Sequence, residues 1–382
     1  MIPKLFDFAI VGTGAAGLQL ALTMLGDSFF QDKQVLLIDK EAKVNNDHTW
    51  CYWEKGIGRY DHLLYKSWEK GLFLSSTAQI ELNLKPYTYK MLRSGDFYAY
   101  AKQKIESATN FTRIQAEVLH LKEGENVQVE TGIGVFSARH VFDSRIDPAF
   151  ATDKKSTKIL QHFKGWMIES VEPVFHPEQF VMMDYRLRKA GTSSFIYVLP
   201  STPYRALVEF TLFTPDLIRE EEYDEILKKY LSAIPGIGNY TITETEMGII
   251  PMSDYPFHKQ HTQRITKIGT AGGWVKPSSG YSFYNGKKFA ERIVAAIKGG
   301  HSPSFTLTKP RFRFYDRIFL DVLFHQNERG EEIFTSMYSK NKVTDIFRFL
   351  DEETSLWEEL RIINRFPHAP FLRAVKNRYF RL

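Results

Sequence analysis

The spacing of apolar residues changes several times along the chain, and each change predicts a different kind of element. Residues 6–11, FDFAIV, form a short apolar run typical of a buried strand. Residues 12–25 begin with glycines and continue with apolar positions at helical spacing, and residues 34–40, QVLLIDK, form a second apolar run. The chain is therefore predicted to begin with a strand, a helix and a second strand.

The predicted turn between the first strand and the helix follows the pattern GxGxxG. Asp39 lies 22 residues beyond the last of these glycines, at the end of the second strand. Such glycines let a pyrophosphate approach main-chain N–H groups at a helix N-terminus, and the acid can bind a ribose. The pattern predicts a dinucleotide site for NAD or FAD, and its residues are Gly12, Gly14, Ala15, Ala16, Gly17 and Asp39.

A second glycine-rich segment, IGTAGGWVKPSSGYSF, occupies residues 268–283 and precedes another helical pattern. A nucleotide domain that begins at the N-terminus and is completed late in the chain is more typical of FAD enzymes. The segment resembles the second flavin motif of geranylgeranyl-reductase-like and aromatic-hydroxylase-like flavoproteins, although Thr270 stands where they usually have an acid. The residues that this resemblance implies for FAD are Gly269, Gly272, Gly273, Pro277, Gly280 and Tyr281.

After a further predicted strand at 140–146, the apolar pattern changes to a period of two. Alternating runs separated by Pro, Gly, Ser and Thr predict antiparallel strands at 164–170, 180–187, 194–200 and 205–213. From Lys309 the pattern is helical again, with one apolar stripe formed by Phe312, Tyr315, Ile318, Phe319, Val322 and Leu323. This stripe is expected to pack in a core, with contact to a membrane surface as the alternative.

Together these patterns predict an α/β (α+β) fold. We expect a Rossmann-like, doubly wound FAD-binding domain of residues 1–147 and 262–300. An antiparallel-sheet substrate domain of residues 148–261 is inserted into it, and residues 301–382 form a C-terminal helical region.

Composition excludes several other classes of protein. Of 382 residues, 43% are hydrophobic and Cys51 is the only cysteine, which rules out an internal disulfide and a cysteine-rich zinc site. The 11 histidines show no HxxxH or HExxH spacing, so no metal site is expected. The net charge of +5 is scattered among acids, which argues against nucleic-acid binding. Without a secretory signal or a long apolar run, the chain is expected in the cytoplasm.

One acid interrupts the predicted strand RALVEFTLF at 205–213. Alternation places Glu209 on the same face as Leu207, Thr211 and Phe213. If that face lines an apolar cavity, desolvation raises the pKa of the carboxyl and allows it to deliver a proton. If the face meets solvent, the acid is inert.

Several separated stretches resemble the lycopene β-cyclases, flavoproteins that form carotenoid rings, and the resemblance covers essentially the whole chain. The family often has Asn at the position of Asp47 and an acidic pair where this chain has Glu209 followed by Phe210. The HTW element and the glutamate strand are the most specific matches. The matching stretches are GTGAAG at 12–17, DHTWCYW at 47–53, VFDSR at 141–145, MMDYR at 182–186, YVLP at 197–200, LVEFTLF at 207–213, EMGIIPM at 246–252 and the segment 268–283.

The resemblance implies an acid–base isomerisation by an intramolecular lyase, without net oxidation. A terminal double bond of lycopene is protonated, the neighbouring double bond attacks the cation, and loss of a proton gives a β-ionone ring, as in γ- and β-carotene. Glu209 is implied as the proton donor. The aromatic residues implied to stabilise the cation are Trp50, Trp53, Tyr185 and Tyr281.

Three further residues are candidates with open alternatives. Asp184 is a second acid or the cap of a turn. His48 contacts the flavin, orients an acid or is structural. Glu246 belongs to the substrate cavity or is a charge at a strand end.

The resemblance also implies reduced FAD, NAD(P)H as its reductant, and peripheral contact with the inner face of the membrane. The alternative function is a redox flavoenzyme of the same fold, such as a prenyl reductase or hydroxylase using NAD(P)H. A third, non-enzymatic alternative is a membrane-bound carotenoid or flavin carrier.

Overall fold

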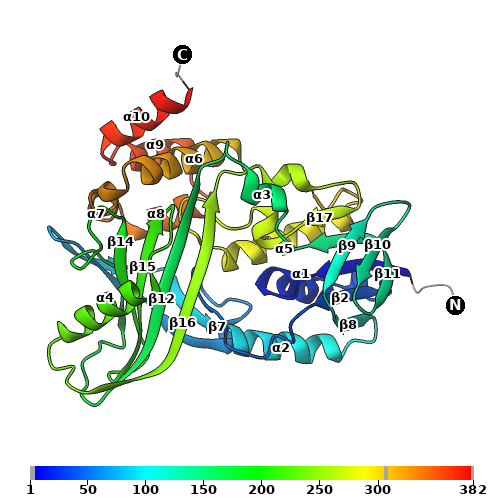
Figure 1. The fold of residues 1–382 in the computed structure, drawn as a ribbon, viewed down its shortest axis with the longest axis horizontal. Helices are drawn as coiled ribbons and strands as arrows, with labels where there is room; N and C mark the ends of the chain where they lie inside the picture. Colours follow the sequence, from blue (N-terminus) through cyan, green and yellow to red (C-terminus); the bar gives the residue numbers. More distant parts are fainter. Residues whose placement is uncertain (1–4, 305–308, 380–382) are drawn as a thin grey trace.

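The computed structural model describes residues 5–304 and 309–379 and arranges their strands in three sheets (Figure 1). The first sheet has seven strands in the order β8-β2-β1-β11-β10-β9, with β17 paired to β11. Its strands are β1 (Leu5–Val11), β2 (Val35–Asp39), β8 (Phe111–Gln115), β9 (Val118–Lys122), β10 (Val127–Thr131), β11 (Gly134–Asp143) and β17 (Ile265–Lys267).

The predicted strand–helix–strand start of the chain is confirmed. Helix α1 (Ala15–Leu25) connects β1 to β2, and β1 is parallel to β2 and to β11. Buried residues of α1 pack with those of α2 (Ser94–Glu106) and α5 (Phe283–Lys298). The carboxyl ends of β1, β11 and β17 therefore meet at one edge, where an open parallel sheet binds its ligands.

The second sheet contains the four predicted antiparallel strands, one later strand (β16) and two strands from early in the chain. Its order is β16-β12-β15-β14-β13-β5-β6. The strands β5 and β6 come from the part of the chain that the sequence assigned to the nucleotide domain. The bounds are β5 (Lys70–Leu74), β6 (Gln79–Asn83), β12 (Lys158–Ser170), β13 (Gln179–Asp184), β14 (Ser194–Pro200), β15 (Arg205–Thr214) and β16 (Tyr240–Ser253).

A third, smaller sheet has the order β3-β7-β4. Its strands are β3 (Thr49–Lys55), β4 (Leu64–Trp68) and β7 (Tyr87–Arg93). Short 3₁₀ turns lie at Ser28–Phe30, Asp61–Leu63, Phe257–Gln260, Gly269–Gly272 and Asn327–Arg329.

The second sheet is covered on both faces. Val208, Phe210 and Leu212 of β15 pack with Tyr223 and Leu227 of α4 (Glu220–Ser232) on one side. Leu207 and Phe213 of the same strand belong to a different apolar cluster on the other side. The alternating pattern of β15 therefore separates two buried faces.

The C-terminal helices pack over the face of the second sheet opposite α4 (Figure 1). On α6 the predicted stripe is buried at Phe312, Ile318, Val322 and Leu323, which confirms the core interpretation of this stripe. The last residues of the chain, 380–382, lie outside the described part. The remaining helices are α3 (Pro148–Thr152), α6 (Pro310–His325), α7 (Gly330–Lys340), α8 (Val343–Leu350), α9 (Leu356–Ile363) and α10 (His368–Tyr379).

Candidate active site

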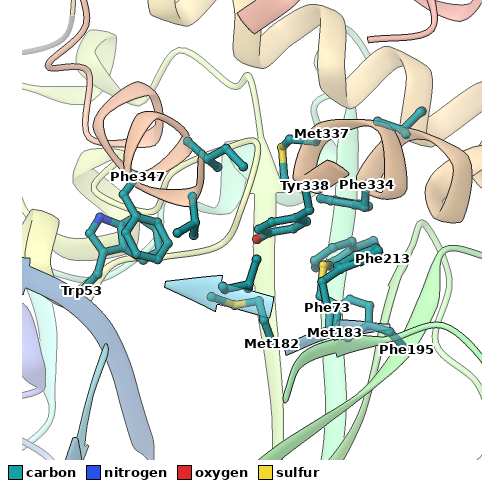
Figure 2. Packing of buried hydrophobic residues seen from close by; sticks show 14 of the residues in the cluster. Trp53, Phe73, Met182, Met183, Phe195, Phe213, Phe334, Met337, Tyr338 and Phe347 are labelled. Carbon is teal, nitrogen blue, oxygen red and sulfur yellow. The ribbon is translucent and has the colours of Figure 1, made fainter. Parts of the chain in front are cut away.

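A cavity of about 400 Å³ lies between the second sheet and the C-terminal helices. Figure 2 shows Phe334, Met337 and Tyr338 of α7 pointing toward side chains of the sheet. The sheet residues that face them in the cavity wall are Met182, Met183, Phe195 and Phe213. Apolar walls of this kind suit a ligand that is recognised by shape rather than by hydrogen bonds.

Glu209 projects into this cavity from β15. Leu207, Thr211 and Phe213 line the cavity beside it, so the predicted shared face is the one that meets the apolar space. The Glu209 side chain is 9% exposed, and its Oε1 accepts a hydrogen bond from the Thr211 hydroxyl at 2.5 Å. Burial away from water is the main cause that raises the pKa of Glu209 to about 8; the Thr211 hydrogen bond lowers this pKa, and the nearby carboxylate of Glu246 adds to the rise. The group therefore carries a proton at neutral pH.

A glycine separates Glu209 from a second carboxyl on the same rung of the sheet. Gly165 of β12 pairs with Glu209 on one side and with Glu246 of β16 on the other. A Cβ atom on Gly165 would lie 3.4 Å from the Cβ of Glu209. Because directly paired residues point to the same face of a sheet, the two acids share one face, and the place of the missing side chain is filled in part by Leu207, whose Cδ1 would lie 3.1 Å from a Cβ on Gly165.

Three tyrosines, two from strands and one from a loop, form a hydrogen-bonded chain in the cavity wall. Tyr197 is paired directly with Glu209 and donates to the hydroxyl of Tyr89 at 2.6 Å. The hydroxyls of Tyr89 and Tyr281 lie 2.8 Å apart. Burial raises the pKa of all three phenols, so they remain neutral and present electron-rich ring faces.

Only two of the four aromatic residues expected to stabilise the cation line the cavity. Trp50 and Tyr281 line the cavity. Trp53 instead stacks on Phe347 with ring centroids 4.3 Å apart, and Tyr185 is buried with its hydroxyl 3.3 Å from that of Ser193. Neither of these two residues is part of the cavity wall.

Sequence reasoning missed Tyr89 and Tyr197 as wall residues. The signal for Tyr197 was present in the hairpin formed by 194–200 and 205–213, because a short connection fixes which residues face each other. Tyr89 lies on β7 of another sheet, and no local pattern relates it to Glu209.

Asp184 lies apart from Glu209. Its carboxylate pairs with Arg186 at 2.6 Å, accepts from the Tyr230 hydroxyl of α4 at 3.1 Å, and caps the turn through the Arg186 N–H at 3.0 Å. Tyr230 is packed against the apolar cluster on the α4 side of the second sheet. These contacts correspond to the turn-cap alternative and place the carboxylate on the side away from the cavity.

His48 and Glu246 flank the start of β3. Glu246 lies in the middle of β16, not at a strand end, and its Oε1 accepts the Thr49 N–H at 2.8 Å. Burial raises the pKa of Glu246. The His48 imidazole is half-exposed, with Nε2 3.9 Å from the Asp47 carboxylate, and it is not part of the cavity wall.

The N-terminal glycine turn has the geometry of an anion-binding site. Gly12 has φ +91°, and Gly17 lies so close that its Cβ would be 2.0 Å from the Gly12 carbonyl oxygen. Helix α1 has no side-chain cap, so its first N–H groups face outward, and the space beside Gly14 is open. Asp39 accepts a hydrogen bond of 3.0 Å from the Thr13 hydroxyl and so braces this turn.

The second glycine segment approaches the first turn at one end and the cavity at the other. A Cβ atom on Gly269 would lie 3.1 Å from that of Ala16. Gly280 has φ +73° and lies against Gln161 at the cavity wall. There the Gln161 Oε1 and the Ser279 Oγ are buried without a hydrogen-bond partner. A ligand that reaches from Gly14 to Gly280 with polar groups at its far end fits this arrangement, as FAD does.

The remaining residues of the second segment shape the loop. Gly273 ends the 3₁₀ turn with φ +73°, and a Cβ on Gly272 would lie 2.5 Å from the Lys267 carbonyl oxygen. Lys276, beside Pro277, is buried and pairs with Asp316 and Glu352, each at 2.9 Å. This cluster fastens the loop to the C-terminal helices.

The described residues lack the features of two other classes of protein. Between residues 5 and 379, leaving out 305–308, no group of three or more His, Cys, Asp or Glu side chains is arranged to bind a metal ion. Over the same residues, no helix combines the length and apolar character needed to cross a bilayer.

The chain is similar in sequence to known carotenoid enzymes. The family model described as lycopene cyclase protein matches residues 7–376. The lycopene beta-cyclase of Pantoea ananas is 23% identical over an alignment of 307 positions, which covers 76% of this chain and 74% of that protein. The lycopene beta-cyclase of a Paracoccus species is 22% identical over 97% of this chain and 96% of its own length.

Solved structures of similar fold are flavoproteins. A geranylgeranyl bacteriochlorophyll reductase-like protein of Thermoplasma acidophilum has a TM-score of 0.60 and 12% identity, covering 98% of this chain and 97% of its own. The flavin-dependent brominase Bmp2 has a TM-score of 0.59 and 14% identity, covering 98% and 99%. At this identity the likeness shows the fold alone, and it confirms the predicted fold class.

Proposed function

The chain belongs to the lycopene cyclase protein family, and from this membership we propose that it converts the linear ends of lycopene into β-ionone rings. The observation that carries the proposal is the position of Glu209, a buried carboxyl with a pKa of about 8 in an apolar cavity. Such a group is protonated at neutral pH and is held where a hydrocarbon can bind.

The proposed reaction is an isomerisation in which every atom is retained. Glu209 transfers its proton to the terminal double bond of lycopene and leaves a tertiary carbocation. The electron pair of the neighbouring double bond closes the six-membered ring, and the new ring cation loses a proton to give the β double bond. The proton gained equals the proton lost, so the overall step is neither oxidation nor reduction.

The cavity wall supports this step by excluding water and by facing the cation with aromatic rings. Water in the cavity would capture a carbocation, and the residues around Glu209 are mostly apolar. The rings of Tyr89, Tyr197 and Tyr281 lie near Glu209 and are neutral. They stabilise positive charge through their π faces.

We propose FAD as the cofactor, bound by the two glycine segments. The N–H groups at the start of α1 would bind its pyrophosphate, and Gln161 and Ser279 would meet its polar ring. When bound in its reduced form, FAD would supply negative charge to stabilise a cation, and NAD(P)H is the proposed reductant. The protein is proposed to act at the inner face of the membrane, where its substrate dissolves.

The test is expression of the chain in cells that accumulate lycopene, followed by chromatography of the carotenoids. The parent chain is expected to yield γ- and β-carotene, and Glu209→Ala and Glu209→Gln are expected to leave lycopene unchanged. Glu169→Gln, which removes an exposed carboxylate from the neighbouring strand β12, is the matched control. Cyclic products from Glu209→Gln at the parent level would refute the role of this acid.

The second candidate is a redox flavoenzyme, which the shared fold with a reductase-like protein and a brominase favours. A reductase or hydroxylase consumes one NAD(P)H for each product molecule. The proposed cyclase needs NAD(P)H only to keep its flavin reduced. Stoichiometric consumption of NAD(P)H would therefore replace the first proposal by the second.

A further inference from the structure

The size of the cavity places part of the substrate outside the protein, if the proposed function is correct. Its volume of about 400 Å³ lies at the lower end of the range of about 300–1,000 Å³ found for sites that bind drug-sized ligands. A polyene of 40 carbon atoms exceeds such a ligand, so one end enters and the rest extends through the mouth. Apolar surface left in water costs about 25 cal/mol per Å². The mouth is therefore expected to face an apolar phase.

The cavity reaches the surface between α6 and α10. Leu372 of α10 lines the cavity and is 67% exposed, and Phe314 of α6 lines it and is 40% exposed. Both side chains therefore belong to the wall and to the outer surface. They mark the mouth of the cavity.

An apolar stripe on α9 runs from the outer surface to the cavity. Leu356, Leu360 and Ile363 are spaced so that they share one side of this helix, and Ile363 lines the cavity. Leu356 and Leu360 are about half-exposed, and the neighbouring Trp357 is 82% exposed.

The side of α9 next to this stripe is fixed to the protein. Glu359 is fully buried and accepts hydrogen bonds from the Arg311 Nε of α6 at 2.9 Å. The exposed stripe is therefore presented by an anchored helix.

Helix α10 presents exposed cations on this surface. Residues 356–379 contain five Arg or Lys and two Glu. Both Glu side chains are paired, Glu358 with Arg348 and Glu359 with Arg311, and two of the cations, Arg361 and Arg378, pair with Asp side chains elsewhere in the chain. Arg373 and Lys376 are exposed and have no ion-pair partner among the described residues.

We propose that this surface, the docking face, binds the surface of a bilayer that contains anionic lipid. The docking face is formed by Leu356, Trp357, Leu360, Leu372, Arg373 and Lys376. The apolar side chains enter the interface while the cations meet lipid headgroups, as in peripheral amphipathic helices. The mouth between α6 and α10 then opens to the acyl chains, and the polyene passes from lipid to Glu209 without crossing water.

The test is flotation of the FAD-loaded full chain with two kinds of vesicles. One consists of phosphatidylcholine, and the other contains one third phosphatidylglycerol. The intact chain is expected to float with the anionic vesicles. The variant Leu356→Ser/Trp357→Ser/Leu360→Ser is expected to lose at least tenfold in partitioning, because a tenfold change needs only about 1.4 kcal/mol of lost burial. Arg373→Gln/Lys376→Gln is expected to lose the preference for anionic lipid.

A matched control separates the docking face from general surface hydrophobicity. Ile57→Ser/Ile133→Ser/Val171→Ser removes three apolar side chains that are at least 65% exposed but lie elsewhere. This control is expected to float like the parent. Quenching of tryptophan fluorescence by lipids with brominated acyl chains is expected in the parent and is expected to be much weaker in Trp357→Phe.

Three results would overturn the inference. They are an intact chain that stays unbound, an α9 variant that floats like the parent, and a surface that instead joins two copies of the chain in solution. Cyclisation of lycopene by the parent in detergent micelles is measured separately. Cyclisation without flotation would reject the docking face and leave the proposed function intact, whereas flotation without cyclisation would reject the proposed function.

Discussion

Replacing Glu209 by Gln is expected to abolish activity and, at the same time, to stabilise the folded protein at neutral pH. Burial raises the pKa of this carboxyl from an ordinary value of 4.5 to about 8. Between these two values the unfolded chain has released the proton while the folded chain still binds it. The free energy of unfolding therefore falls as the pH rises from 4.5 to about 8, and it falls no further above that value.

The size of the effect follows from the shift. One pH unit within the window corresponds to about 1.4 kcal/mol for one proton. At pH 7, about 2.5 units above the ordinary pKa, the carboxyl lowers the stability of the parent by about 3 kcal/mol relative to an uncharged group. Glutamine has no proton to lose and retains an oxygen that accepts the Thr211 hydrogen bond.

The assay is urea unfolding of the FAD-loaded parent and variant across the range from pH 5 to pH 8, followed by tryptophan fluorescence. The stability difference between them is expected to grow with pH and to be small at the acidic end. The control is Glu169→Gln, whose exposed carboxyl is expected to give no such trend. Parallel pH profiles for the parent and Glu209→Gln would refute the reasoning, because they would mean that Glu209 is hydrated in the folded state.

Three other substitutions test separate parts of the site. Glu246→Gln removes a charge close to Glu209 and is expected to lower the pH of the alkaline limb of the pH–rate profile by about one unit. The reason is that two charges about 10 Å apart interact by about 1.7 kcal/mol at an effective dielectric constant of 20. An alkaline limb at the same pH as in the parent would contradict this coupling. Gly12→Ala places a Cβ 1.9 Å from the Ser144 Oγ at φ +91° and is expected to abolish flavin absorbance per chain, whereas Gly132→Ala, in open space, retains it. Lys276→Met leaves Asp316 and Glu352 without their cation and is expected to lower the free energy of unfolding by about 3–5 kcal/mol in urea titrations. The double variant Lys276→Met/Asp316→Leu is expected to recover part of this loss. If Lys276→Met is as stable as the parent, the ion-pair cluster is dispensable.

The parts of the fold that the sequence predicts well depend on short-range patterns. The initial β1–α1–β2 unit follows from the spacing of the glycines and the period of the apolar residues. The shared face of Leu207 and Glu209 follows from alternation within one strand. The membership of β5 and β6 in the second sheet does not follow from any local pattern, because β5 pairs with β13, which is remote in the chain, and β6 joins the sheet only through β5. For the same reason Tyr89, on another sheet, and the orphaned Gln161 Oε1 were not predicted.

Asp184 illustrates the limit of reading chemistry from residue type. The sequence offers it as an acid in a specific motif, and the motif does place it at the end of a strand. Its function in the structure is decided by which face of the sheet it meets. Its carboxylate is fully buried, but Arg186 and Tyr230 satisfy it, so Asp184 is held as an ion-pair partner. Asp184 and Glu209 belong to the same sheet but have different surroundings, because their side chains point to opposite faces of it.

The contacts of the loop 276–281 suggest that the helical region does more than close the cavity. Lys276 fixes one end of this loop to Asp316 of α6 and to Glu352 after α8, while Tyr281 at its other end joins the hydrogen-bonded tyrosine chain next to Glu209. Between these two anchors, Gly280 adopts a left-handed conformation against Gln161 of the second sheet. A shift of α6 would therefore move the proposed flavin-binding loop relative to Glu209. Since a proton transfer tolerates errors of only a few tenths of an ångström in the positions of its partners, we infer that the buried ion pairs of Lys276 contribute to the geometry of the reaction as well as to stability.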